Sequence, residues 1–161
     1  MSPEPEFYIK PRDEKADQFL VLACDGVWDV MSNEDICNFI THRMKVHDNL
    51  ETICNEVIDT CLYKVIFDRI FDFWKYDTFD NCFFFQGSRD NMSIIIIAFP
   101  SAPTVEQEAV RQENELNSIL EKKVTELIES HNNDVELSYV HQFLGEEDIP
   151  HLPPGGGLAA K

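Results

Sequence analysis

Two short acidic segments, each beside an apolar run, contain the residues of this chain that could do chemistry. Asp25 and Asp29 follow the apolar run 19–24, and Asp90 precedes the apolar run 94–97. Carboxylates at the ends of two core strands are suited to holding a hard divalent cation, because Mg²⁺ and Mn²⁺ take oxygen ligands and keep several waters. The simpler interpretation is that each segment is only a turn, since Asp and Gly favour turns. The two segments together favour the metal site.

Two predicted strands position these acidic residues. The first, 19–24, is apolar without alternation, and so is the second, 93–99, which Pro100 stops. A continuous apolar run is typical of a strand that is buried on both faces, so we expect both strands to be covered on both sides.

The rest of the chain is predicted to be mainly helical. Ser32 and Asp35 form a capping box that opens one helix, and a second apolar stripe predicts another helix from about residue 50. Thr104 with Gln107 is expected to cap a long third helix, which Asn132-Asn133 should end. A shorter helix is expected over about 134–144, and the Pro- and Gly-rich tail 152–157 is interpreted as a linker.

Composition excludes several classes of function. The chain has 161 residues, enough for one domain or slightly more, and 43% of them are apolar. Its net charge of −17 argues against binding to nucleic acid or to an anionic membrane, which requires a cationic surface. Charged residues interrupt the aromatic segment 65–86, so it is not expected to insert into a membrane.

The five cysteines are widely spaced and form no CxxC pair. This pattern is typical of small buried hydrophobic residues in a reducing compartment. We therefore expect an intracellular protein, placed in the cytoplasm with the nucleus as a second location. If the chain folds, we expect it to be a monomer.

Four segments match one family closely, and their sequences are SPEPE (2–6), VLACDGVWDVM (21–31), CNEVIDTCLYK (54–64) and GSRDNMS (87–93). They resemble the PPM-type (type 2C) metal-dependent protein serine/threonine phosphatases, most of all the animal alpha/beta members. The resemblance covers nearly the whole chain except residues 65–86.

The resemblance implies an α+β fold, in which a β-sandwich is flanked by helices and followed by a helical domain. It implies a centre of two Mn²⁺ or Mg²⁺ ions that hydrolyses phosphoserine and phosphothreonine in phosphoprotein substrates. Asp25 and Asp90 match positions that ligate one ion, and Asp29 matches the position of a weaker third metal site. Asn91 is a candidate to hydrogen-bond a metal-bound water or orient the neighbouring carboxylate. Its alternative role is that of a turn residue.

The resemblance also divides the chain. Residues 1–100 are expected to form the C-terminal part of the catalytic domain, and residues 101–161 part of a C-terminal helical domain. The family's metal-bridging aspartate and phosphate-binding arginine would then lie upstream of Met1. We therefore expect this chain to bind metal weakly and to be inactive alone. The alternatives are a non-catalytic phosphatase-like binding module and an incomplete gene product.

Residues 65–86 form an atypical insertion between Lys64 and Gly87, which the family joins directly. They contain seven of the twelve phenylalanines. The segment begins with a valine, whose codon starts with GT, and it ends in Phe-Phe-Phe-Gln, which a pyrimidine tract followed by CAG encodes. These are the two ends of an intron, so one interpretation is an intron that was retained in frame. The other interpretation is a functional insertion, in which a short amphipathic helix carries one apolar face, formed by Phe67, Ile70, Phe71 and Trp74.

Overall fold

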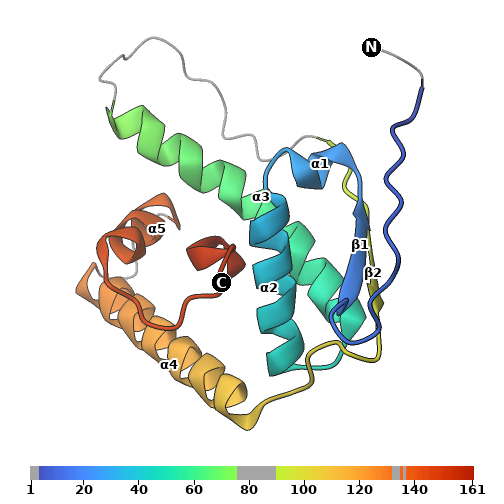
Figure 1. Ribbon diagram of the computed structural model, residues 1–161. Coiled ribbons are helices and arrows are strands. Elements are labelled where there is room, and N and C mark those ends of the chain that lie inside the picture. Colours follow the sequence, from blue (N-terminus) through green and yellow to red (C-terminus); the bar gives the residue numbers. More distant parts are fainter. Residues whose placement is uncertain (1–3, 76–89, 132–134, 136) are drawn as a thin grey trace.

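The computed structural model describes residues 4–75, 90–131, 135 and 137–161. Its first half contains strand β1 (Phe19–Ala23), the short helix α1 (Asp25–Trp28), and helices α2 (Asn33–Val46) and α3 (Leu50–Lys75). Strand β2 (Ile94–Ala98) follows, and then helices α4 (Gln107–Ser130) and α5 (Leu137–Glu146) and the 3₁₀ helix η1 (Gly157–Ala160). Figure 1 shows the two strands beside α2 and α3, with α4 and α5 on the other side of these helices.

The two strands form an antiparallel pair. Phe19 lies opposite Ala98 and Ala23 opposite Ile94, so β1 and β2 pair along their full length. Helices packed on a small antiparallel sheet confirm the α+β class. This pair is the whole sheet in the described residues, so the predicted β-sandwich remains a prediction.

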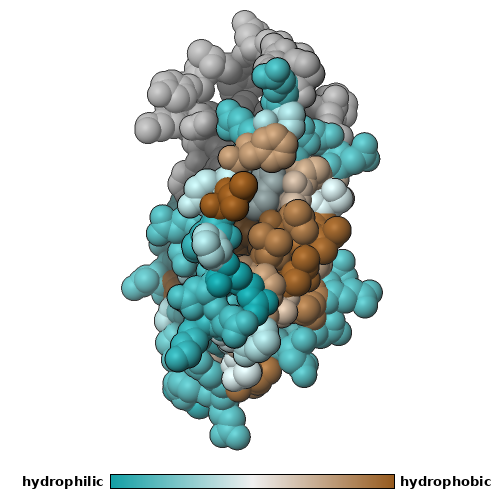
Figure 2. All heavy atoms as spheres, turned by 45° about the vertical axis from the view of Figure 1, so that its right-hand side comes forward, coloured by the Kyte–Doolittle hydropathy of each residue, from teal (hydrophilic) through white to brown (hydrophobic). Residues whose placement is uncertain are grey.

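The sheet is covered on one face only. Phe19, Val21 and Ile96 pack against the helices. On the other face, large apolar side chains are between 43% and 59% exposed: Leu20, Leu22, Ile95 and Ile97. Figure 2 shows hydrophobic residues gathered on this side of the molecule. The expectation that both strands are covered on both faces is therefore wrong for the described residues, because only one layer of helices packs on the sheet.

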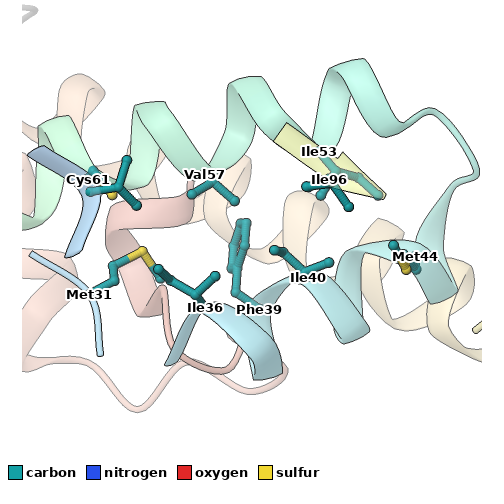
Figure 3. Packing of buried hydrophobic residues seen from close by; sticks show 10 residues of the cluster. Met31, Ile36, Phe39, Ile40, Met44, Ile53, Val57, Cys61 and Ile96 are labelled. Atoms are coloured by element: carbon teal, nitrogen blue, oxygen red, sulfur yellow. The ribbon is translucent and has the colours of Figure 1, made fainter. Parts of the chain in front are cut away.

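The main core lies between α2, α3 and the inner face of the sheet. As predicted, Ser32 caps α2: its hydroxyl accepts from the Asp35 N–H at 3.1 Å and donates to the Asp35 carboxylate at 2.8 Å. The apolar stripes of the two helices face one another (Figure 3). The buried hydrophobic residues of this cluster are Val27, Met31, Ile36, Phe39, Ile40, Met44, Ile53, Val57, Cys61 and Ile96.

A second cluster holds the C-terminal helices together, and its buried members are Leu116, Leu127, Val140, Leu144 and Ile149. The predicted Thr104 cap is wrong, because α4 begins at Gln107 with Glu106 as its N-cap residue. The Glu106 N–H donates to the Lys45 carbonyl at 2.8 Å and so ties the start of α4 to the end of α2. The expected end at Asn132-Asn133 lies outside the described residues.

The tail after residue 152 is not a free linker. Pro153 is fully buried, and η1 packs against α3. Gly155 has a φ of +76°, and a Cβ there would lie 2.2 Å from the Asp35 carbonyl oxygen. A Cβ on Gly156 would lie 3.0 Å from the Phe39 ring. The glycines that suggested a linker instead allow the tail to lie directly on α2.

Helix α3 continues through residues 65–75, so the first half of the atypical segment extends the second predicted helix. The expected apolar face of Phe67, Ile70, Phe71 and Trp74 concerns side chains outside the described ones. None of the described helices combines the length and apolar content needed to cross a bilayer.

Candidate metal centre at one end of the sheet

Asp25 is the first residue of α1, directly after β1 and its connecting residue Cys24. Its side chain is exposed, and its Oδ1 accepts a hydrogen bond from the Gly26 N–H at 3.1 Å. The apolar strand therefore ends just before Asp25, which places this carboxylate at one end of the sheet and at the surface.

Asp90 reaches the same end of the sheet from the other strand. Because β1 and β2 are antiparallel, the end of β1 lies beside the start of β2. Asp90 is exposed, and its Oδ1 accepts from the Asn91 N–H at 2.9 Å. A Cβ built on Gly26, next to Asp25, would lie 3.5 Å from the Cβ of Asp90. The two predicted ligands therefore belong to touching turns.

Cys24 joins the two turns through both its main chain and its side chain. Its N–H donates to the Ser93 carbonyl at 3.2 Å, which continues the strand pairing by one residue. Its thiol donates to the Asn91 carbonyl at 3.1 Å and accepts from the Ser93 N–H at 3.2 Å. Hydrogen bonds from Ser93 lower the pKa of the Cys24 thiol. Its place in an apolar run predicts only a small buried hydrophobic residue, so these contacts have no signal in the sequence.

Helix α1 is tied to the strand end. The Trp28 indole N–H donates to the Ala23 carbonyl at 2.9 Å, and the Asp29 N–H donates to the Asp25 carbonyl at 2.8 Å. Asp29 therefore lies one helical turn beyond Asp25, and its side chain is exposed. This places the candidate for a weaker metal site beside the first ligand.

Asn91 takes part in the site through its main chain. Its N–H donates to Asp90 and its carbonyl accepts from the Cys24 thiol. These contacts suit a residue that shapes the turn, and the expected role of its side chain toward a metal-bound water remains a prediction.

The donor set suits a hard divalent cation that keeps part of its water shell. Asp25 and Asp90 offer carboxylate oxygens at an exposed position, and the nearby Cys24 sulfur is engaged in hydrogen bonds. Within the described ranges, no group of three His, Cys, Asp or Glu side chains is arranged to hold a metal ion. The two carboxylates alone therefore fit one part of a magnesium or manganese site, with the other ligands still to be supplied.

Two family models match this sequence. The model described as "Protein phosphatase 2C" matches residues 1–70. The model described as "Protein serine/threonine phosphatase 2C, C-terminal domain" matches residues 93–161. Residues 71–92, which include most of the atypical segment, fall between the two matches.

Curated relatives align with the whole chain. The sequence is 48% identical to Protein phosphatase 1A of Bos taurus and 49% identical to that of Mus musculus. It is 45% identical to Protein phosphatase 1B of Mus musculus. The alignments cover 100% of this chain but 37% of each phosphatase 1A and 36% of phosphatase 1B. The chain therefore spans little more than a third of these relatives.

Proposed function

Because this chain belongs to the protein phosphatase 2C family, we propose that it is part of a metal-dependent phosphatase that hydrolyses phosphoserine and phosphothreonine in proteins. The observation that carries this proposal is the meeting of the Asp25 and Asp90 turns at one end of the sheet. The names of these relatives state protein phosphatase activity. The chain spans only 36–37% of their length, so the activity of the whole protein is part of the proposal.

Asp25 and Asp90 would bind one Mn²⁺ or Mg²⁺ ion, and Asp29 would contribute to a weaker third site. When bound, such ions supply an activated water and neutralise charge on the phosphoryl oxygens. The two aspartates provide negative oxygens at an exposed position that a phosphorylated side chain on a protein surface can reach. The site therefore needs no serine or cysteine nucleophile from this chain.

We further propose that the open face of the sheet packs against a second sheet in the complete catalytic domain, as in the β-sandwich expected from the family. The exposed side chains of Leu20, Leu22, Ile95 and Ile97 support this proposal. Apolar patches of this kind usually mark a packing surface.

The test replaces the matching 37% of mouse Protein phosphatase 1A with residues 1–161, with and without residues 65–86. We expect Mn²⁺-dependent hydrolysis of a phosphothreonine peptide from the chimera that lacks 65–86, and loss of this activity in Asp25→Asn and Asp90→Asn. An exposed carboxylate on α4, removed by Glu121→Gln, is the matched control and should leave activity unchanged.

For the 161-residue chain alone we expect no Mn²⁺-dependent hydrolysis of p-nitrophenyl phosphate, because two carboxylates leave most of the metal coordination to water. Chimera activity that survives both aspartate substitutions would refute the site. A folded but inactive chimera that binds phosphopeptides would favour the non-catalytic binding module.

A further inference from the structure

Gly26 occupies the point where the two aspartate-bearing turns touch. It is buried, although the adjacent Asp25 is exposed. A Cβ at this position would lie 2.9 Å from the Asn91 carbonyl oxygen, 3.3 Å from the Met92 Cγ and 3.5 Å from the Asp90 Cβ. The nearest of these atoms is main chain, which gives way less easily than the end of a flexible side chain. The absence of a side chain at Gly26 therefore sets how closely the turns approach.

The segment around Gly26 has little freedom to move away from this contact. Val27, the next residue, is fully buried in the main core, and its N–H donates to the Cys24 carbonyl at 3.1 Å. Trp28 is held by its hydrogen bond to the Ala23 carbonyl. An added methyl group would therefore push against the Asn91 carbonyl rather than swing outward.

Displacement of Asn91 would be transmitted to Asp90. The Asn91 N–H is hydrogen-bonded to the Asp90 carboxylate, and the Asn91 carbonyl accepts from the Cys24 thiol. The thiol thus holds the Asn91 carbonyl in place on one side while Gly26 leaves room for it on the other.

We propose that Gly26 and the Cys24 thiol are positioning residues that set the separation of the Asp25 and Asp90 carboxylates. Neither residue needs to contact the metal or the phosphate. The inference rests on the proposed function, since it assumes that the two carboxylates share one cation. On this proposal, the metal affinity of the site depends partly on the packing of Gly26 against the Asn91 carbonyl.

The experiment is a Mn²⁺ titration of the isotopically labelled 161-residue chain, followed by paramagnetic broadening of amide signals. In the unchanged chain, the amides of Asp25 and Gly26 and those of Asn91 and Met92 should broaden with one shared midpoint. In Gly26→Ala, we expect the midpoint to rise about ten-fold, which is typical when the support of a metal ligand is removed. Amides on α4 report non-specific binding to the acidic surface.

Gly156→Ala is the matched control, because its Cβ would lie 2.8 Å from the Ala160 Cβ and 3.0 Å from the Phe39 ring, away from the site. It should lower the thermal midpoint of unfolding without moving the Mn²⁺ midpoint. An equal Mn²⁺ midpoint in Gly26→Ala and Gly156→Ala would overturn the inference.

Asp25→Asn separates the two levels of the argument. An unchanged Mn²⁺ midpoint in this variant would refute the proposed metal site itself. A raised midpoint in Asp25→Asn with none in Gly26→Ala would refute only the positioning role. Should Gly26→Ala lose its dispersed spectrum, Cys24→Val carries the test, because it removes the thiol that donates to the Asn91 carbonyl and leaves a small apolar side chain in its place. A Mn²⁺ midpoint unchanged in Cys24→Val would then overturn the inference.

Discussion

A buried charge cluster centred on Arg43 joins three helices, and its removal gives the sharpest prediction about stability. Arg43 lies on α2 and donates to both carboxylate oxygens of Glu56 on α3, at 2.8 Å and 2.6 Å. It also donates to Glu113 on α4 at 2.8 Å. Lys161, after η1, forms an ion pair with the same Glu113. The cluster therefore links the main core to the C-terminal helices.

The perturbation is Arg43→Met, which keeps the apolar stem and removes the guanidinium. Removing one partner of a buried ion pair costs roughly 3–5 kcal/mol, because the other charge stays buried without compensation. The Glu56 side chain is 26% exposed and Glu113 keeps Lys161, so both retained charges are partly compensated. We therefore expect the free energy of unfolding to fall by about 3 kcal/mol, the low end of that range.

Urea unfolding of the 161-residue chain at pH 7, followed by circular dichroism, measures this loss. Arg111→Met is the matched control, because Arg111 on α4 also pairs with two glutamates, Glu108 and Glu115, but at an exposed position. Exposed ion pairs contribute little to stability, so the control should leave the free energy of unfolding nearly unchanged. A loss in Arg43→Met no larger than in the control would refute the reasoning.

Two further predictions concern the pH dependence of this cluster and the atypical segment. Burial opposes the charge on Glu113, but hydrogen bonds from Lys161 and Arg43 outweigh it and lower the pKa of this carboxyl. Its stabilising contribution is therefore present above the unfolded pKa of about 4.5 and lost as the pH falls through the folded value. Glu113→Gln should thus lower the free energy of unfolding at pH 7 by about 1–3 kcal/mol and flatten the acid loss, whereas parallel pH profiles would contradict the argument. Deleting residues 65–86, which joins Lys64 to Gly87, should raise the thermal midpoint and reduce aggregation if the segment is a retained intron, and a lower midpoint would favour a functional insertion.

The helices of the main core could be predicted because their signals are local. The Ser32 cap is formed by residues three apart, and the buried positions of α2 and α3 follow helical spacing. The prediction that Thr104 caps α4 was wrong because the start of this helix involves a contact that is distant in sequence. The Glu106 N–H donates to the Lys45 carbonyl. The packing of the tail could not be predicted for the same reason. Gly155 and Gly156 lie against α2, a contact between segments more than 100 residues apart in the sequence.

The candidate site likewise has one part that the sequence predicts and another that only the folded structure shows. Asp25 and Asp90 could be placed at strand ends from sequence, but their turns meet only because β1 and β2 are antiparallel in the observed register. Gly26 and Cys24 carry no local signal for a positioning role. An Asp-Gly pair is an ordinary turn signal, and a cysteine in an apolar run is an ordinary core residue. Their importance comes from Asn91, which lies opposite them.

The composition of the strands carries information about surroundings that the described residues do not supply. A sheet with one solvated face usually alternates apolar and polar residues, yet β1 and β2 are apolar at every position. On one face of the sheet, the apolar side chains pack against the helices. The helices do not explain why the other face is also apolar, so we infer that a different partner covers it. The prediction of two-sided burial was wrong for this structure, but the same pattern supports the proposed second sheet. That sheet would also cover the open side of the strands whose ends carry Asp25 and Asp90, so metal affinity and closure of the sandwich should be gained together.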